Sequence, residues 1–452
     1  MRIKGNSYHT GHREWSRAMN KKYLETSKAL LEFIEQSPTA FHAVDNCKKQ
    51  LEQAGFQELT EQQEWKLELG GKYYVIRNGS AVMAFVLPAG GKEESLMIKG
   101  VHAMAAHSDS PCFKLKTNPE QKAEEYYLKL NVEKYGGMIL STWLDRPLTV
   151  AGRVVVKDKK TGELVTRLIE FDQDLCVIPN VAIHMNRDMN KGVEYNPQVD
   201  MLPLFADAKH AGELEKQIAE KAGVEPEEIL GRELYLVTRD KGTFLGLEQE
   251  YIGSPRLDDL QCVFSGLTAI CKTKPRDYID LLAVFDNEEV GSGTRQGACS
   301  TFMRDTLERI CDSLHLSETD YKRLIAGSFF ISADNAHAVH PNHPEKADPT
   351  NRPLLNGGIV IKHHGGQKYT TDAWSEAYFV DVCREADVPV QHYHNRSDIL
   401  GGSTLGNLST AQIPAKTVDI GLPQLAMHSA YETAGTKDTW YLVEALKEFY
   451  KA

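Results

Sequence analysis

Short apolar runs separated by amphipathic stretches recur along most of this chain. A continuous apolar run of about 4–8 residues is typical of a buried strand, and apolar residues at three- and four-residue spacing are typical of a helix. The predicted strands are Lys72–Ile76, Ala81–Leu87, Leu96–Ala106, Ile279–Phe285, Gly327–Ser332, Gly357–Lys362 and Thr417–Gly421. The predicted helices are Asn20–Ile34, Ala40–Ala54, Asp258–Cys271, Ala298–Leu314, Thr370–Ala386 and Asp438–Tyr450. Alternation of this kind predicts an α/β fold.

The alternation is interrupted in the middle of the chain. Between residues 113 and 247 the pattern predicts mostly strands, with one helix near Ala211–Ala222. We interpret this segment as a β-rich domain inserted into a discontinuous domain that consists of residues 1–112 and 248–452.

Composition and charge narrow the class of protein. The chain has 452 residues, which is too long for a single hydrophobic core of ordinary size, so two domains are expected. Apolar residues make up 41% of the chain and charged residues 25%, which is typical of globular proteins. The formal net charge of -11 argues against nucleic acid or an anionic membrane as a partner. No apolar run reaches the roughly 20 residues that a membrane span requires.

Two further features bear on location. The segment Met1–Lys22 is polar and basic without the apolar centre of a signal peptide, and we expect it to be a mobile leader. None of the eight cysteines forms a C-x-x-C pair, so a cysteine-type structural zinc site is not expected. Without an export signal the thiols are expected to be reduced, and the predicted location is the cytoplasm.

Charged residues follow several of the predicted strands. Glu288 and Glu289 follow one strand, Asp334 follows another, and Lys362 ends a third. Two adjacent glutamates at the end of a buried strand are unfavourable unless positive charge meets them. Our interpretation is that one glutamate is a metal ligand and the other a general base toward water. For the isolated pair, an exposed acidic loop is the alternative.

Four other positions are candidates for chemistry or packing. In the triplet from His107 to Asp109, the carboxylate can hold the imidazole or a metal, and a hydrogen-bonded turn histidine is the alternative. Asp258 begins a predicted helix, either as a cap or as a carboxylate shared by two cations. His428 follows the last predicted strand. His184 ends an apolar run, which by itself is typical of a packed histidine.

Together these residues form the set that a two-metal hydrolytic centre requires. Such a centre needs a shared carboxylate, a histidine and a carboxylate for each cation, and a free base. Two cations about 3.5–4 Å apart bind the attacking and leaving oxygens and lower the pKa of water. A serine hydrolase is disfavoured because the chain has no G-x-S-x-G motif.

Six strings in this chain resemble those of the aspartyl aminopeptidase family of di-zinc metallopeptidases, in a bacterial-type form: HSDSPC, STWLDRPLTVAGRV, SPRLDDL, FDNEEVGS, SADNAHAVHP and GLPQLAMHS. The resemblance runs in order over nearly the whole chain. It implies a mixed-sheet αβα metallopeptidase catalytic domain with an inserted β-rich dimerisation domain. It also implies a homo-oligomer, a dodecamer built from dimers, which encloses the active sites.

The resemblance further implies the metal ligands. One zinc would be held by His107 and Asp334, and the other by Glu289 and His428. Asp258 would bridge the two ions. Cobalt and manganese are the alternative ions.

The same resemblance implies roles for residues that do not bind metal. Glu288 would be the base that takes a proton from water and returns it to the leaving amine, and Asp109 would orient His107. Lys362 matches a position that faces an acidic P1 side chain. His184 matches a histidine that reaches the active site of a neighbouring subunit and stabilises the tetrahedral intermediate.

The expected function is removal of N-terminal residues, above all Asp or Glu, from short peptides. Asp259 stands where the family usually has an asparagine, and this additional carboxylate bears on the metal preference. Three alternatives stay open from the sequence. They are a member of the family with neutral or basic residue preference, a related di-metal amidase or deacylase, and a catalytically silent assembly protein.

Overall fold

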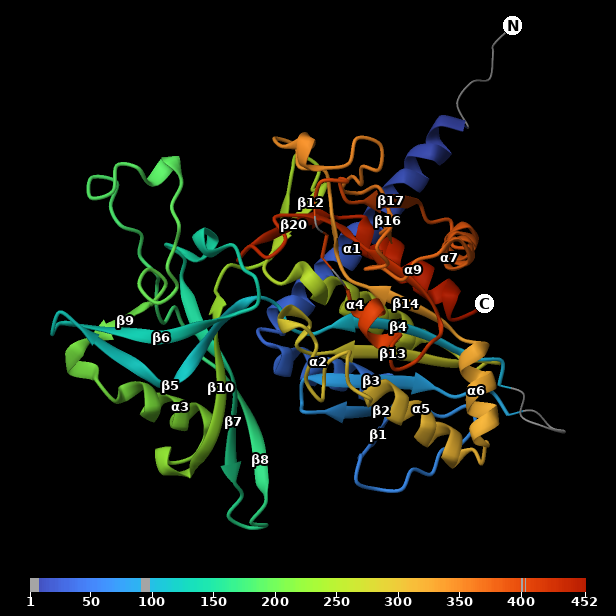
Figure 1. Cartoon of the computed structure of the whole chain (residues 1–452), viewed down its shortest axis with the longest axis horizontal. Coiled ribbons are helices and arrows are strands. Elements are labelled where there is room, and N and C mark those ends of the chain that lie inside the picture. The colour runs from blue at the N-terminus through green and yellow to red at the C-terminus, as the bar shows by residue number, and fades with distance from the viewer. Residues whose placement is uncertain (1–7, 91–97, 400, 403) are drawn as a thin grey trace, which may run out of the picture.

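A mixed nine-stranded sheet forms the centre of the fold (Figure 1). In the computed structural model, which describes residues 8–90, 98–399, 401–402 and 404–452, the strand order is β1-β2-β3-β13-β4-β14-β18-β16-β17. The strands are β1 (Gln57–Leu59), β2 (Lys72–Arg77), β3 (Ala81–Val86), β4 (Val101–His107), β13 (Ile279–Phe285), β14 (Phe329–Ala333), β16 (Ile359–His363), β17 (Val390–His394) and β18 (Lys416–Gly421). The neighbours β13, β4, β14 and β18 run parallel, whereas β3 and β16 join them antiparallel.

Helices cover both faces of this sheet. One apolar core contains residues of α1 (Tyr8–Glu35), α2 (Ala40–Gln53), α4 (Leu257–Lys272), α7 (Ala373–Glu385) and α9 (Asp438–Phe449). A second core contains residues of α5 (Phe302–Ser313), α6 (Glu318–Ala326) and α8 (Leu405–Ser409). Successive residues of β13 alternate between the cores, since Leu282 belongs to the first and Leu281 to the second. The prediction of an α/β fold is confirmed.

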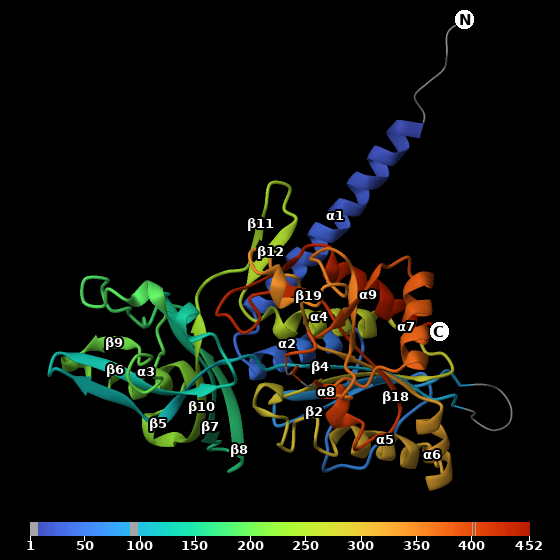
Figure 2. The same ribbon diagram turned by 45° about the horizontal axis from the view of Figure 1, so that its top comes forward.

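A six-stranded antiparallel sheet lies beside this assembly in both ribbon views (Figures 1 and 2). Its order is β8-β7-β10-β5-β6-β9, and it has its own apolar core, to which α3 (Glu213–Ala222) contributes. The strands are β5 (Cys112–Ala123), β6 (Tyr127–Tyr135), β7 (Leu148–Lys157), β8 (Leu164–Glu170), β9 (Leu204–Asp207) and β10 (Ile229–Thr238). All of them come from the β-rich middle of the chain, and the division into domains at residues 113 and 247 stays a prediction.

A third sheet consists of short strands in the order β11-β12-β20-β19-β15. These are β11 (Thr243–Leu245), β12 (Tyr251–Ser254), β20 (Glu432–Gly435), β19 (Pro423–Leu425) and β15 (Ala336–His337). It joins chain segments that directly precede or follow several of the predicted site residues.

The structure differs from the sequence-based expectations at several element ends. The segment expected to be a mobile leader is helical from Tyr8, because polar residues such as Glu14 and Arg17 have good helix propensity and continue α1. Strand β4 begins at Val101 rather than Leu96, which lies outside the described residues. Helix α5 begins at Phe302, after residues whose hydroxyl groups bond locally.

None of the helices in the described part of the chain combines the length and the apolar composition of a membrane span.

Candidate active site

The carboxyl ends of three neighbouring parallel strands meet at one edge of the nine-stranded sheet. His107 is the last residue of β4 and Asp334 directly follows β14. Glu288 and Glu289 follow β13 in the short 3-10 turn η5 (Glu288–Val290). Because parallel strands present their carboxyl ends at the same edge, the four side chains converge there.

Asp258 and His428 reach the same place from the third sheet. Asp258 lies between β12 and the regular part of α4, its φ and ψ of -83° and 108° are not helical, and the peptide bond to Asp259 is cis. His428 lies between β19 and β20 with a φ of 66°, in the left-handed region that non-glycine residues seldom adopt. The short strands therefore position two residues that the central sheet does not carry.

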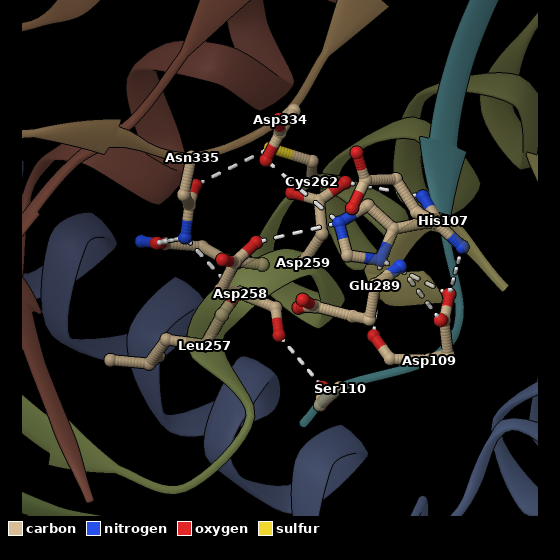
Figure 3. A network of polar contacts seen from close by, with 12 residues as sticks. His107, Asp109, Ser110, Leu257, Asp258, Asp259, Cys262, Glu289, Asp334 and Asn335 are labelled. Atoms are coloured by element: carbon tan, nitrogen blue, oxygen red, sulfur yellow. Dashed lines mark hydrogen bonds and ion pairs between the residues drawn. The ribbon is translucent and has the colours of Figure 1, made fainter. Parts of the chain in front are cut away.

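Asp258 is shared by two groups of potential metal ligands. Figure 3 shows it beside His107, Asp334 and Glu289. The Nε2 atom of His107 lies 3.5 Å from Asp258 Oδ1 and 3.8 Å from Asp334 Oδ1. The Nε2 atom of His428 lies 3.4 Å from Asp258 Oδ2 and 3.5 Å from Glu289 Oε2. One carboxylate thus presents an oxygen to each group, which is the arrangement that a bridging ligand requires.

Asp109 connects the ends of β4 and β13. Nδ1 of His107 donates a hydrogen bond to the main-chain carbonyl oxygen of Asp109 at 3.0 Å, and Asp109 Oδ1 lies 3.4 Å away. The Asp109 carboxylate accepts the backbone N–H groups of Glu288 and Glu289, both at 3.2 Å, and the hydroxyl of Tyr135 at 2.7 Å. This network leaves Nε2 of His107 available for a metal.

Asp258 and His428 share a buried partner that sequence reasoning missed. Glu432 accepts the backbone N–H of His428 at 2.8 Å and that of Asp258 at 3.0 Å. Burial, assisted by the charge of Asp258, raises the pKa of Glu432 to about 8. On the other side of the ring, His428 Nδ1 donates to the carbonyl oxygen of Gly137 at 3.0 Å. No sequence signal identifies Glu432, because the two site residues that it positions are held through their backbone amides.

We expect replacement of Glu432 by alanine to weaken zinc binding about 10–100-fold, as is typical when a group that orients metal ligands is lost. Competition with a chelator of known affinity measures this change. The matched control is Glu318→Ala, on the surface of α6, which leaves affinity unchanged. Equal zinc affinity in the Glu432→Ala and parent chains contradicts the positioning role.

Burial and mutual interaction shift the pKa values of the cluster. Burial raises the pKa of Glu288 to about 7 against the opposing charge of His107, and it raises that of Glu289 well above its usual range. Burial alone would raise the pKa of Asp258 and lower those of both histidines, but their hydrogen bonds outweigh it. The pKa of Asp258 is therefore lowered, that of His107 lies well above its usual value, and that of His428 is raised to about 10. A cation that binds here releases protons.

The donor atoms of the cluster fit a divalent metal. Within the described residues, Asp258 Oδ1 and Glu289 Oε1 are buried without a hydrogen-bond partner. A buried carboxylate oxygen without a donor is unfavourable, and a cation removes that penalty. Imidazole nitrogens combined with carboxylate oxygens are ligands that zinc takes in hydrolases.

The cluster opens on a pocket that also contains a buried lysine. Its lining includes Asp258, Glu288, Asp334, Asn335, Ala336, His337, Lys362, Tyr369, Tyr393, Gly402, Thr404, Met427 and His428. The Lys362 side chain is only 4% exposed, and its Nζ lies 3.5 Å from Asp334 Oδ2. Burial alone would lower the pKa of Lys362, but nearby groups, led by Asp334, raise it above its usual value, so the amine is charged.

His184 is the one predicted site residue that the structure does not bring to the cluster. It is exposed on the segment between β8 and β9, beside the six-stranded sheet.

The fold and this cluster define a metal-dependent hydrolase of the α/β class, and comparisons with known proteins agree. The family described as aminopeptidase I zinc metalloprotease (M18) matches residues 33–450. A probable M18 family aminopeptidase 2 of Clostridium acetobutylicum is 47% identical over 434 residues, which cover 95% of this chain and 99% of that protein. Among solved structures, mApe1 of Chaetomium thermophilum superposes with a TM-score of 0.85 at 32% identity, covering 95% of this chain and 97% of that one. The mApe1 dodecamer of S. cerevisiae superposes with a TM-score of 0.82 at 29% identity, with the same coverage of both chains.

The chain belongs to the M18 family of zinc metalloprotease aminopeptidases. It is a metal-dependent aminopeptidase, a hydrolase that acts on peptides. The predicted metallopeptidase family and the prediction of an enzyme are confirmed, and the alternative of a catalytically silent assembly protein is set aside.

Proposed function

We propose that this aminopeptidase removes N-terminal aspartate and glutamate from short peptides. The observation that carries the proposal is the charged, buried Lys362 in the pocket beside the metal-ligand cluster. A buried ammonium group can pair with a substrate carboxylate, and such charge-assisted bonds are stronger than neutral ones. The same pocket is lined by Glu288, so substrate binding and proton transfer share one space.

The catalytic roles follow the geometry of the cluster. His107, Asp334, Glu289 and His428 would hold two zinc ions with Asp258 between them, and cobalt or manganese are the alternative ions. When bound, these ions polarise the scissile carbonyl and lower the pKa of water.

Glu288 accepts the proton of the attacking water and returns it to the departing amine nitrogen. A pKa near 7 suits a group that both takes and gives a proton at neutral pH. Asp109 keeps His107 in the required tautomer, and its carboxylate holds the backbone of Glu288 by accepting the N–H group of Glu288.

A panel of aspartyl, glutamyl, leucyl and lysyl substrates tests the proposed specificity. We expect kcat/KM to be highest for the two acidic residues with the zinc-loaded enzyme. Highest activity on the leucyl or lysyl substrate contradicts acidic specificity and favours the alternative of a neutral or basic preference.

Lys362→Met extends this test to the residue itself. Because a bond to a charged group contributes about 1.5–3 kcal/mol, we expect the ratio of aspartyl to leucyl kcat/KM to fall roughly 10–100-fold. Using the ratio separates specificity from any disturbance of Asp334, since both substrates share the same metal centre. Lys416→Met, on β18 against Trp374, is the matched control that keeps the ratio. An unchanged ratio in Lys362→Met contradicts the role of this lysine.

We also propose that the chain forms a homo-oligomer, a dodecamer built from dimers, through residues 113–247. Exposed apolar side chains gather on the segment that carries His184: Val181, Ile183, Met185 and Val199 are 50%, 47%, 82% and 68% exposed. Exposed apolar groups of this kind favour a protein contact. The mApe1 of S. cerevisiae is a dodecamer. In such an assembly His184 would reach the active site of a neighbouring subunit.

The cytoplasm is the proposed location. All eight cysteines are free thiols, which suits a reducing compartment.

A further inference from the structure

Away from the catalytic cluster, two histidines and a glutamate come together at the edge of the nine-stranded sheet. His363 ends β16, His392 lies on the edge strand β17, and Glu376 lies in the first turn of α7. Figure 1 shows these three elements close together. We propose that His363, His392 and Glu376 form a further transition-metal site, separate from the catalytic centre, that binds a zinc ion.

The separations of the three donor atoms match those around a tetrahedral zinc ion. Ligand atoms placed about 2.0–2.1 Å from a zinc ion at tetrahedral angles are about 3.3–3.4 Å apart. His363 Nε2 lies 3.3 Å from His392 Nδ1, and His392 Nδ1 lies 3.4 Å from Glu376 Oε1. The third separation, from His363 Nε2 to Glu376 Oε1, is longer, at 3.9 Å. The catalytic cluster shows similar separations, from 3.4 to 3.8 Å.

The chemistry of the three side chains also suits zinc. Each of the two histidines presents a ring nitrogen to the other ligands, and Glu376 presents a carboxylate oxygen, which are donor atoms that zinc takes. The ring of His394 stacks on that of His363 at 4.9 Å with an angle of 6° but is not one of the three ligands. Two imidazoles and one carboxylate leave a fourth position open to water.

The triad is accessible and lies on a different side of the sheet from the catalytic pocket. The side chains of His363, Glu376 and His392 are 18%, 31% and 42% exposed, so an ion can enter from solvent. Successive strand residues face opposite sides, and Lys362 lines the catalytic pocket while His363 faces α7. A zinc ion at the triad joins α7 to both strands of this edge.

Anomalous diffraction from crystals of the zinc-loaded full chain tests the proposal. We expect a peak at the zinc edge between His363, His392 and Glu376, within bonding distance of all three. Its position distinguishes this peak from zinc in the catalytic cluster, so the result does not depend on the catalytic assignment. Absence of this peak, while zinc occupies the catalytic cluster, overturns the proposal.

A solution experiment uses variants of the same surface. After dialysis against free zinc, we expect His392→Gln and Glu376→Gln each to contain one zinc fewer per chain than the parent, with peptide hydrolysis unchanged. His394→Gln removes a histidine two residues away on the same strand and is expected to keep the parent zinc content. Thermal unfolding checks that all variants are folded. If both ligand variants contain as much zinc as the parent, the triad is held by hydrogen bonds without metal and the proposal is wrong. If His394→Gln loses as much zinc as the ligand variants, the assignment of the ligands is wrong.

Discussion

Replacement of Glu288 by glutamine is expected to lower kcat about 10²–10⁴-fold, the contribution typical of a general acid–base group, while zinc stays bound. Glutamine has nearly the same shape but cannot accept a proton. The side chain lines the pocket beside His107 and Glu289, and burial places its pKa near that of a base working at neutral pH. Steady-state kinetics and metal analysis of the same preparation measure both quantities.

The neighbouring residue provides the control for this experiment. Glu289 lies 3.5 Å from His428 Nε2 in one ligand group, so Glu289→Gln is expected to lose metal as well as activity. Full activity of Glu288→Gln contradicts the assignment of Glu288 as the general base. Loss of zinc from Glu288→Gln would instead identify Glu288 as a metal ligand. This outcome is a genuine alternative because Glu288 lies in one group of potential ligands with His107 and Glu289.

Replacement of Asp258 by alanine is expected to empty both ligand groups and to lower kcat/KM by about 10³-fold or more, because metal ions contribute several kcal/mol and each 1.36 kcal/mol is tenfold in rate. The expectation rests on the two oxygens of Asp258, one 3.5 Å from His107 and the other 3.4 Å from His428. Metal content per chain, measured after dialysis at fixed free zinc, is the direct readout.

His428→Ala is the matched comparison for Asp258→Ala. It removes a ligand from one group only and leaves His107, Asp258 and Asp334 in place, so we expect it to lose metal from that group alone. If Asp258→Ala keeps as much metal as His428→Ala, the carboxylate does not bridge the two groups.

The central part of the candidate site was accessible from the sequence for a simple reason. Apolar runs locate strands, and the polar residues that follow them must lie at strand ends, which predicts Glu288, Glu289 and Asp334 as site residues. Their convergence depends on the strand order, in which β4 lies between β13 and β14. Hydrophobic patterns do not contain that order, and the family resemblance supplied it indirectly.

Other residues of the site cannot be predicted from the hydrophobic pattern, because their positions depend on short strands and long-range contacts. Glu432 begins β20, a strand of only four residues, and it holds Asp258 and His428 through their backbone amides. Strands of this length have no recognisable periodicity. Lys362 and His184 acquired roles only through the resemblance. The triad of His363, Glu376 and His392 requires the parallel pairing of β16 with β17, which places Ile361 opposite His392.

Tyr135 donates a hydrogen bond to the Asp109 carboxylate, and the carbonyl oxygen of Gly137 accepts one from the ring of His428. Tyr135 and Gly137 belong to the β-rich middle segment, yet one holds Asp109 and the other fixes the ring of His428. Cutting out that segment would therefore leave a catalytic half with a loosened metal ligand, so the two halves are not interchangeable modules. In the proposed oligomer, a tilt of the six-stranded sheet imposed by a neighbouring copy would change the affinity of the proposed centre for metal ions, and by reciprocity metal loading would change how strongly the copies associate.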